Sequence, residues 1–559
     1  MLFAGCKKDS DVVRLSANIE RIGGDTKVWL DTVDIPVFFT SNEVVKINDE
    51  TCTISYSNNR CSLTPTACTT GYYAVYPASI VTSSAITDTT VNIKLPHLQN
   101  YEVDADGHQK LDLPCAAVIP AGSNSTSLHF YNLCSLIEVR CTNATEEPIT
   151  ISSIEVTAVG TGLWGEGTAT LAGANSSISI PYNGRNSRVV LEIPNAEAVA
   201  AGAPTETYYV VVPPYTDATT FTVKVRFNQG KSSFTATKTN AVLGRNIIVE
   251  LHSAVDPEED TELSGYFSIS STQKVVFSKG NLQHRGAVND VSADTWFFAD
   301  NQYDFYGRRN FNNPNSTYEA EVLSTTVDLF AWSITNESTS GQSGVVSPSF
   351  GLRAPEESND YDFSSASSRF NEWGKLSIDG GPAGVWFTLS PSEWDYLLDD
   401  RANASNLRCN TVITGVTGHP TNPTDTISIQ GIMLFPDDWS MEDDVPSGIT
   451  LTTSGVNTIT AANWHRLEAV GAVFLPAAGY RIATESVNIW QDFEGNYKVG
   501  YYWTNLRAGG SSEAKYMQYS FYSDRYAATL SSADAQTHFG HSVRLVKSAP
   551  GYNMTGRWN

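Results

Sequence analysis

Alternation of apolar and polar residues with a period of two runs through the first 250 or so residues. It is clearest in Phe221–Phe227 (FTVKVRF), Thr150–Thr157 (TISSIEVT) and Ile247–Leu251 (IIVEL). Successive side chains of an extended strand point to opposite faces, so this pattern gives each strand one apolar face. Gly, Asn and Pro turns separate the runs about every 8–12 residues, which is typical of antiparallel sandwiches. From Arg14 to about Leu251 the sequence therefore predicts an all-β fold.

The second half has a different pattern, because two short helices become readable. Ser390-Pro391-Ser392-Glu393 has an N-cap serine, an N1 proline and an N3 glutamate in capping-box order. Thr460 caps a second helical run, which ends near Gly471. Strand-like segments such as Gly431–Pro436 and Gly471–Pro476 surround both. We therefore predict an α+β fold for the second half.

An acidic segment separates the halves. Residues 254–264 contain a proline and have no apolar period, so they are predicted to form a linker. The whole chain is then divided as follows: a tether over 1–12, a first β-sandwich over 13–124, a second over 125–253, the linker over 254–264, a large domain over 265–548 and a tail over 549–559.

The charge of the chain excludes several kinds of partner. With 36 basic and 60 acidic side chains the formal net charge is −24. Nucleic acids and anionic membrane surfaces require a basic face, and no stretch of this chain provides one. No apolar run reaches the roughly 20 residues that a membrane-spanning helix needs.

The amino terminus, Met1–Cys6 (MLFAGC), resembles a bacterial lipobox, in which small residues precede the cysteine that receives a diacylglycerol anchor. This interpretation predicts lipidation of Cys6, an outer-membrane lipid anchor in the precursor, and a start within the signal peptide. The alternative is that Cys6 is an ordinary residue. The seven other cysteines form no CxxC pair, so buried free thiols are expected rather than a zinc site or a disulfide framework. Cys134 and Cys141 are expected on opposite faces of one strand.

Several phrases of the first half resemble the fimbrillin family, which are the subunits of type V pili in Bacteroides-like bacteria. They are Gly71–Pro77 (GYYAVYP), Leu128–Val139 (LHFYNLCSLIEV), Tyr208–Pro214 (YYVVVPP) and Leu243–Leu251 (LGRNIIVEL). The resemblance implies two tandem fimbrillin-like β-sandwiches and a lipidated precursor. It also implies assembly by strand exchange, in which an arginine-specific protease removes the first strand and a pilin subunit donates a β-strand in its place.

Val13–Ile19 (VRLSANI) is the expected first strand, and Arg21–Asp25 (RIGGD) is the expected loop behind it. Arg14 and Arg21 are the candidate cleavage sites. For each of them the alternative is a solvated surface arginine.

The second half resembles the C-type-lectin-like domains appended to such pilins, including those that retroelements diversify. The phrases are Val275–Leu282 (VVFSKGNL), Leu389–Leu398 (LSPSEWDYLL), Gly431–Trp439 (GIMLFPDDW), Gly471–Arg481 (GAVFLPAAGYR) and Gly540–Val546 (GHSVRLV). The resemblance implies a ligand-binding domain. Because this module stands where a polymerising pilin would have its donor strand, it implies a tip subunit that accepts a strand. Whether a retroelement diversifies the chain cannot be read from protein sequence.

In this fold the segments Gly500–Arg507 and Ala514–Tyr526 would display the ligand face. Scaffold positions are expected at Trp503, Ala514, Met517, Tyr519, Gly540, Val543 and Leu545, and outward positions at Lys515, Tyr516, Gln518 and Ser520. Tyrosines with Arg and Asn provide rigid and adaptable contacts, as in antibody paratopes. The predicted ligand contacts are Tyr501, Asn505, Arg507, Lys515, Tyr516, Gln518, Tyr522, Asp524, Arg525, Tyr526 and His541. The alternative is a solvated polar edge.

Enzymatic readings are weaker. Formylglycine-generating enzymes of the same broad fold need a cysteine pair near the carboxyl end, but this half has only Cys409. The sequences through which calcium-dependent lectins hold sugars are absent, and Trp490–Asp492 (WQD) and Trp503–Asn505 (WTN) are only imperfect echoes of them. No metal and no cofactor is therefore expected, and a calcium site is the alternative. A glycosidase could use Asp437, Asp438, Asp399 or Asp400 beside Trp439 or Trp394, although a solvated turn is the simpler interpretation.

Together these resemblances imply a non-enzymatic pilus tip adhesin on the cell surface, which binds a glycan or a protein. One alternative is a non-polymerised surface lipoprotein that binds glycans. A weaker one is a carbohydrate-active enzyme.

Overall fold

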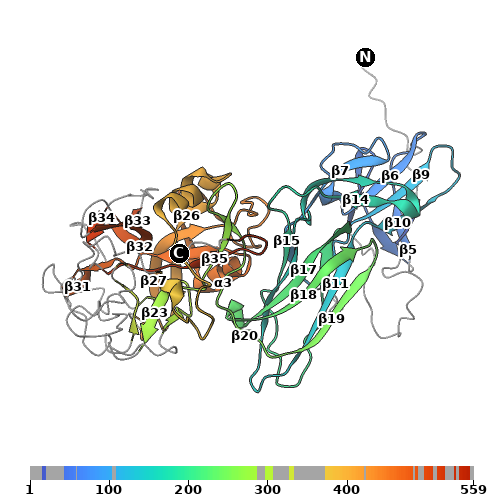
Figure 1. Cartoon of the computed structure of the whole chain (residues 1–559). Coiled ribbons are helices and arrows are strands. Elements are labelled where there is room, and N and C mark those ends of the chain that lie inside the picture. The colour runs from blue at the N-terminus through green and yellow to red at the C-terminus, as the bar shows by residue number, and fades with distance from the viewer. Residues whose placement is uncertain are drawn as a thin grey trace, which may run out of the picture. The chain divides into compact units, whose positions relative to one another are not determined.

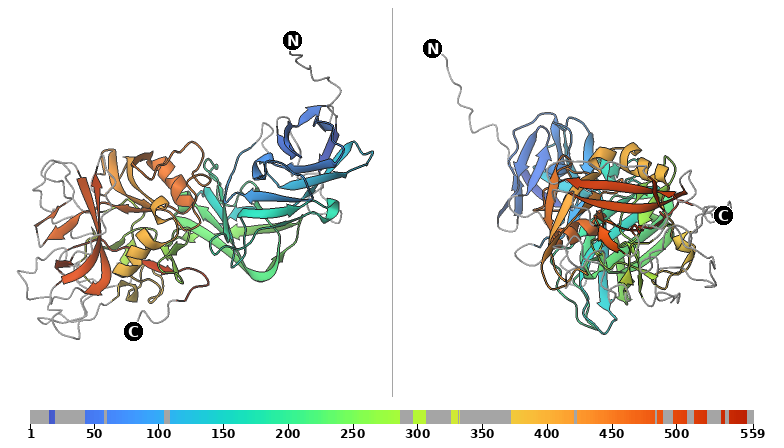
Figure 2. Two further views of the ribbon diagram at one scale, coloured as in Figure 1. Left: turned by 90° about the horizontal axis from the view of Figure 1, so that it is seen from above. Right: turned by 90° about the vertical axis from the view of Figure 1, so that its left-hand side faces the viewer.

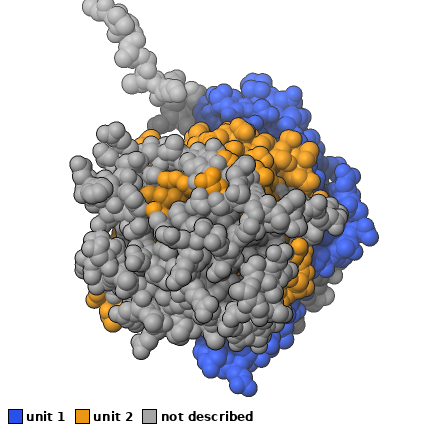
Figure 3. Space-filling model, turned by 60° about the vertical axis from the view of Figure 1, so that its left-hand side comes forward, with its two compact units in different colours: residues 1–258 blue, residues 259–559 orange. Residues whose placement is uncertain are grey.

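The computed structural model of the chain consists mostly of β-strands with few helices (Figure 1). It divides into two compact units, residues 1–258 and 259–559, which Figure 3 distinguishes by colour. The structure describes residues 15–19, 43–57, 60–103, 109–285, 296–305, 326–330, 332, 372–420, 423–482, 485–488, 497–507, 513–522, 534–536 and 540–553.

The first unit contains an eight-stranded sheet with the first strand of the chain in its interior. The strand order is β3-β2-β6-β9-β10-β1-β5-β4. Leu15, Val45, Ala74 and Phe130 belong to one buried apolar cluster on this sheet. The strands are β1 (Leu15–Ile19), β2 (Val44–Ile47), β3 (Glu50–Thr53), β4 (Ser55–Ser57), β5 (Arg60–Leu63), β6 (Gly71–Tyr76), β9 (Cys115–Pro120) and β10 (Ser127–Asn132).

Three further sheets complete the first unit. Their orders are β16-β11-β19, β20-β18-β17-β12-β15-β8 and β14-β13-β7. The strands are β7 (Thr90–Leu95), β8 (Leu98–Asn100), β11 (Ser135–Asn143), β12 (Ile151–Ala158), β13 (Gly165–Thr170), β14 (Ser177–Ser179), β15 (Arg188–Glu192), β16 (Tyr208–Val212), β17 (Tyr215–Phe227), β18 (Ser232–Leu243), β19 (Ile248–Val255) and β20 (Glu258–Glu259).

The expected alternation is confirmed in these strands. Val223 and Val225 of β17 and Ile154 and Val156 of β12 join one apolar cluster, which also receives Val139 of β11. Strands of the sheet β16-β11-β19 and of the six-stranded sheet therefore share one core, as in a sandwich.

The expected division at residue 124 is not kept by the strand pairing. β7 pairs with β13, and β8 pairs with β15, so two early strands join later ones. β10 lies beyond residue 124 but pairs with β1 and β9. The first unit therefore contains interleaved rather than consecutive halves. The sequence did not reveal this, because pairing between distant strands leaves no local signal in it.

The expected linker is also largely structured. β19 continues to Val255, and β20 follows at Glu258–Glu259. Leu263 is 7% exposed and belongs to a core cluster of the second unit. The composition of residues 254–264 predicted a linker, but both ends of the segment take part in the folded units.

In its described residues, the second unit consists of short sheets, two α-helices and short helical turns. Its sheets have the orders β21-β22-β35, β24-β23-β25, β28-β26-β27-β29, β30-β31 and β32-β33-β34. The strands are β21 (Phe267–Ser268), β22 (Lys274–Phe277), β23 (Leu282–Arg285), β24 (Trp296–Phe298), β25 (Thr326–Val327), β26 (Arg408–Val416), β27 (Ile427–Leu434), β28 (Val456–Thr460), β29 (Val473–Pro476), β30 (Tyr480–Ile482), β31 (Glu485–Asn488), β32 (Tyr497–Arg507), β33 (Glu513–Tyr522), β34 (Asp534–Gln536) and β35 (Val546–Ser548).

Both predicted helix starts are confirmed. In α2 (Pro391–Asp395) the backbone N–H of Glu393 donates to Ser390 Oγ, and the N–H of Ser390 donates to Glu393 Oε2 at 2.8 Å. A π-helical turn, Tyr396–Asp400, follows. In α3 (Ala461–Ala469) the N–H of Asn463 donates to the Thr460 hydroxyl at 3.2 Å.

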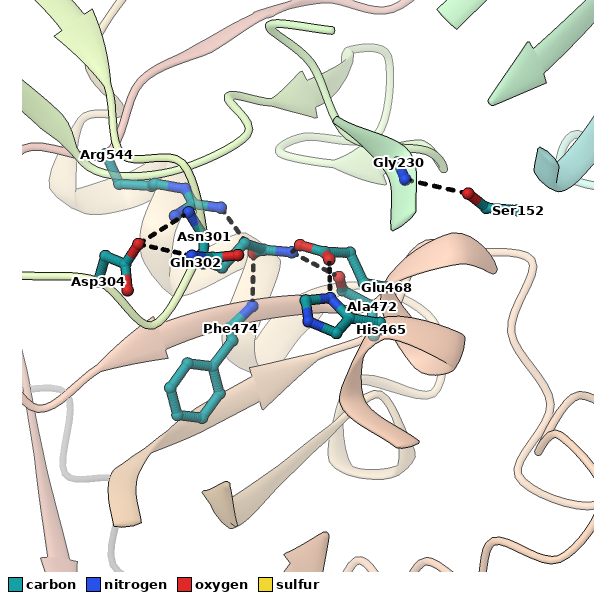
Figure 4. A network of polar contacts seen from close by, with 10 residues as sticks. All are labelled: Ser152, Gly230, Asn301, Gln302, Asp304, His465, Glu468, Ala472, Phe474 and Arg544. Carbon is teal, nitrogen blue, oxygen red and sulfur yellow. Dashed lines mark hydrogen bonds and ion pairs between the residues drawn. The ribbon is translucent and has the colours of Figure 1, made fainter. Parts of the chain in front are cut away.

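A buried polar network joins the last segment of the second unit to α3 and β29 (Figure 4). Gln302 Nε2 donates to Glu468 at 2.8 Å, and Gln302 Oε1 accepts from the backbone N–H of Phe474 and from Arg544 Nη2, at 2.8 and 2.7 Å. Burial lowers the pKa of Arg544 to about 10, so this guanidinium stays charged at neutral pH. The network fixes the chain around Arg544, next to the strands that carry the predicted ligand face.

Candidate ligand-binding hairpin

The predicted ligand face lies on an antiparallel pair of long strands, drawn in orange-red in Figure 2. β32 pairs with β33 so that Tyr501 is opposite Gln518 and Trp503 is opposite Tyr516. The register shifts between Trp503 and Arg507, where the two strands form a bulge. Seven predicted contacts lie on these two strands: Tyr501, Asn505, Arg507, Lys515, Tyr516, Gln518 and Tyr522. Asp524, Arg525 and Tyr526 lie outside the described residues.

The hairpin is packed on both faces. Tyr502, Met517 and Tyr519 join one core cluster, and Trp503 and Ala514 join a second. The seven predicted scaffold positions are buried: Trp503, Ala514, Met517, Tyr519, Gly540, Val543 and Leu545. This part of the prediction is confirmed.

Gly500 allows the two strands to approach closely. A Cβ atom at this position would lie 2.2 Å from Cε1 of Tyr519. Tyr519 in turn donates its hydroxyl hydrogen to the carbonyl of Leu475, and Tyr502 donates to the carbonyl of Pro476 at 3.0 Å. The hairpin is thereby held against β29, which makes it a rigid support for the side chains on it.

Three tyrosines from three strands surround the ring of His541. The centroid of this ring lies 6.0 Å from that of Tyr480, 5.2 Å from that of Tyr501 and 4.9 Å from that of Tyr516. The three tyrosines are half-buried. We call Tyr480, Tyr501 and Tyr516 the tyrosine cluster. Tyr480 was not among the predicted contacts, because the bridge between Gly479 and Gly500 that brings β30 to β32 has no signal in the sequence.

His541 is placed differently from the prediction. Its side chain is 1% exposed, and its ring stacks on Trp503 with the centroids 4.1 Å apart. Ser542, Val543, Arg544 and Leu545, which follow it, are each at most 1% exposed, so the whole segment lies in the interior. Burial lowers the pKa of His541 to about 3. In this structure His541 is therefore a neutral support beneath the tyrosine cluster rather than a surface contact.

The other predicted contacts for which the structure describes burial are half-buried: Tyr501, Asn505, Lys515, Tyr516 and Gln518. Lys515, Tyr516 and Gln518 are neither buried like core side chains nor fully exposed to solvent. Asn505 also links the hairpin to the chain before α2, since its Nδ2 donates to the carbonyl of Thr388 at 3.3 Å. Ser520 lies on β33.

The acidic residues considered for glycoside hydrolysis have structural partners. Asp437 lies 3.1 Å from Arg401 Nη1 and 3.0 Å from Lys274 Nζ. Burial alone would raise the pKa of Asp437, but these two cations and the hydrogen bonds from Ser268 outweigh it and hold the pKa below its usual range. Asp399 accepts from Arg408 at 2.7 Å. Asp437 therefore stays ionised as the centre of a buried ion network.

The aromatic residues considered as a sugar platform are also in the core. Trp394 is 1% exposed and Trp439 is 5% exposed. The ring of Trp439 stacks on Phe435 with the centroids 4.3 Å apart. In this arrangement neither indole offers a face to a sugar.

The cysteines of the described residues are free thiols, as expected. Cys134 and Cys141 lie in different core clusters, but Cys134 precedes β11, so the two are not on one strand as expected. Burial raises the pKa of Cys141 to about 11. Within the described ranges there is no cluster of three or more His, Cys, Asp or Glu side chains that could hold a metal ion. The same part of the chain has no helix long and apolar enough to cross a membrane. Cys6, Arg14 and Arg21 lie outside the described residues.

Comparison with known proteins relates the first unit to one family. Three solved structures of proteins provisionally assigned to cell adhesion are similar to part of the chain, and each comparison covers 44% of it. They come from Bacteroides ovatus (12% identity, 95% of that chain, TM-score 0.27), Bacteroides thetaiotaomicron (16%, 98%, 0.24) and Bacteroides fragilis (10%, 94%, 0.24). Comparison with curated proteins gives no match. Residues 38–271 match the Fimbrillin-like family, so the chain contains a fimbrillin-like domain.

Proposed function

We propose that this chain is a pilus tip adhesin, which accepts a donor strand through its first unit and binds a ligand through its second. The proposal rests on the position of β1 in the eight-stranded sheet. It lies between β10, to which it is parallel, and β5, to which it is antiparallel. A strand at the amino end of the chain therefore occupies an interior position of an eight-stranded sheet.

Loss of β1 would leave a site that a new strand can fill. The backbone groups of β5 and β10 that face β1 would lose their partners, and buried unpaired backbone groups are costly. Leu15 of β1 is 1% exposed and packs in one cluster with Leu63, Leu128 and Phe130. A segment that replaces β1 thus gains both ladder hydrogen bonds and an apolar contact, which is strand addition.

Cleavage by an arginine-specific protease and lipidation of Cys6 belong to the same proposal. Of the two candidate cleavage sites, Arg21 follows β1, so cleavage there would release the strand, whereas cleavage at Arg14 would leave β1 attached. Digestion of purified precursor with such a protease, followed by amino-terminal sequencing, tests the cleavage. Replacement of Arg14 and Arg21 together by Lys should leave β1 in place and prevent the chain from entering filaments. Filaments that contain the uncleaved variant would contradict strand replacement.

The tip position is tested on cells. Immunogold labelling with antibody against the second unit is expected to mark filament ends. Uniform labelling of the envelope on cells without filaments would support the other candidate, a surface lipoprotein that captures glycans. The tyrosine cluster favours that candidate to the same degree, since rigid amphipathic rings suit sugars as well as proteins.

Ligand binding without catalysis is proposed for residues 265–548. The full chain is screened against glycan and protein arrays, and hits are re-measured with Tyr501→Ala/Tyr516→Ala. We expect the double variant to lose at least about tenfold in affinity with little change in Tm, because these rings are half-buried. Hits that bind the variant equally well would place the site elsewhere. Hydrolysis of any polysaccharide in the screen would overturn the non-enzymatic assignment.

A further inference from the structure

The chain from Ser127 to Asn143, which forms β10 and β11, has a single edge along which two strands lie in succession. β1 pairs parallel with β10, with Ile19 opposite Phe130. β19 pairs parallel with β11, with Ile248 opposite Leu136.

Hydrogen bonds identify this edge. The N–H of Leu133 donates to the carbonyl of Pro114, next to β9. The N–H of Asn246 donates to the carbonyl of Cys134, on the opposite edge, next to β19. Successive backbone groups of a strand face opposite edges, so Phe130 and Asn132 face the edge of β10 opposite β9. On that edge the side chain of Arg245, just before β19, donates to the carbonyl of Asn132. β1 and β19 therefore occupy the same edge, one after the other.

The turn Gly244–Ile247 fills the interval between them. Arg245 Nη1 donates to the carbonyl of Asn132 at 2.6 Å, and Arg245 Nη2 donates to the carbonyl of Ala174 at 3.0 Å. Asn132 Nδ2 donates to Asn246 Oδ1 at 2.8 Å. The side chain of Asn132 is fully buried, and Asn246 is 9% exposed with a φ of 58°. The carbonyl that would accept the next ladder hydrogen bond beyond Phe130 thus already has the guanidinium of Arg245 as its donor.

The turn is also held from β11. Ser135 Oγ donates to the carbonyl of Gly244 at 2.7 Å and accepts from the N–H of Ile247 at 2.9 Å. These contacts assign a physical task to Leu243–Leu251 (LGRNIIVEL): its first residues close one end of the β1 position, and the rest forms β19.

We propose that the turn Gly244–Ile247 is a stop that limits how far a strand can run along β10. The partner that fits is an extended segment of another subunit that pairs opposite Ser127–Phe130 and then leaves the edge. The stop sets the length and the register of that segment. This inference rests on the proposed replacement of β1.

The test uses the full chain with a site-specific protease sequence inserted between Gly23 and Gly24. The cut chain is refolded with a fluorescent peptide of residues 13–19 (VRLSANI), and binding is followed by anisotropy. Unlabelled competitors are the same peptide and one lengthened by four threonines at its carboxyl end, the end that points toward the turn. With the native turn, we expect the two competitors to differ by less than about twofold.

When the stop is removed, the four added threonines should pair with β10 and increase the affinity of the lengthened peptide. In Arg245→Ala/Asn246→Gly we expect the lengthened peptide to bind about fivefold more tightly than the short one, because new ladder bonds form. Lys238→Ala, at an exposed position of β18, should behave like the native chain. If the double variant does not refold, Arg245→Gln alone is used, with an expected gain of about threefold.

The outcomes separate the two proposals. Lengthening the peptide could improve binding equally in the native chain and in the variant, or in neither of them. Either result would contradict the proposed stop and leave strand replacement intact. If the short peptide binds no chain, strand replacement itself is wrong, and the stop falls with it.

Discussion

Two buried titratable side chains of the second unit lie in opposite surroundings. Asp437 has Arg401 and Lys274 within 3.1 Å. His541 is packed among aromatic rings, and its Nδ1 has no hydrogen-bond partner among the residues that the structure describes. The first environment favours the charged form of its residue, and the second favours the neutral form. Each environment lowers the pKa of its residue in the folded state. The unfolded state therefore binds protons more readily at both residues, and the free energy of unfolding falls in acid.

Asp437→Asn should destabilise the second unit by about 3 kcal/mol, because the buried Arg401 and the partly buried Lys274 lose their counter-charge. The pKa of Asp437 is lowered in the folded state, so its contribution is fully present above the usual carboxyl pKa and is lost as the pH falls through the lowered value. Denaturant unfolding at pH 7 measures the loss, and Asp400→Asn, at an exposed position, is the control. Equal stability of the two variants would show that the network contributes nothing.

His541 should make stability fall between pH 6.5 and about 3, since the unfolded state binds a proton that the folded state excludes. The expected slope from this residue is about 1.4 kcal/mol per pH unit. His541→Phe should reduce the slope of stability against pH, whereas His129→Gln, at an exposed position, should not. Urea titrations at several pH values give the free energy of unfolding of each variant. An unchanged slope of this free energy against pH in His541→Phe would contradict a buried neutral ring at position 541.

At the scale of elements, local signals were predictable and distant pairings were not. The capping box of Ser390 and Glu393 lies within four residues, so the sequence alone revealed the start of α2. The same holds for the alternation that buries Met517 and Tyr519. By contrast, the pairing of β7 with β13 joins segments about 75 residues apart, and no local pattern specifies it. Tyr480 was missed for the same reason.

The cap of α2 can be tested by itself. Ser390→Ala should cost about 1 kcal/mol, because the N–H of Glu393 loses its acceptor. Ser392→Ala is the comparison in the same turn: Ser392 is exposed, and it loses only its contact with the Ser390 hydroxyl at 3.2 Å, so a smaller loss is expected. Thermal unfolding of both variants gives the comparison; a larger loss from Ser392→Ala would mean that the cap is not what stabilises this turn.

At the scale of the whole molecule, the two units have separate cores. We expect two calorimetric transitions, each belonging to one unit. Leu128→Ala, in the first unit, and Asp437→Asn, in the second, should each lower one transition and leave the other within about 1 °C. A single transition that both variants shift would show that the units unfold together.

In the described part of the second unit, an early strand, β22, pairs with the strand nearest the carboxyl end, β35. Val275 of β22 is opposite Ser548 of β35, and Phe277 is opposite Val546. Entry to and exit from this unit are therefore neighbours in one sheet, which is the arrangement that tolerates insertion of a domain into a loop of a host protein. Such a unit can be moved between scaffolds as a cassette, and its ligand hairpin, which is anchored internally to β29, should move with it unchanged.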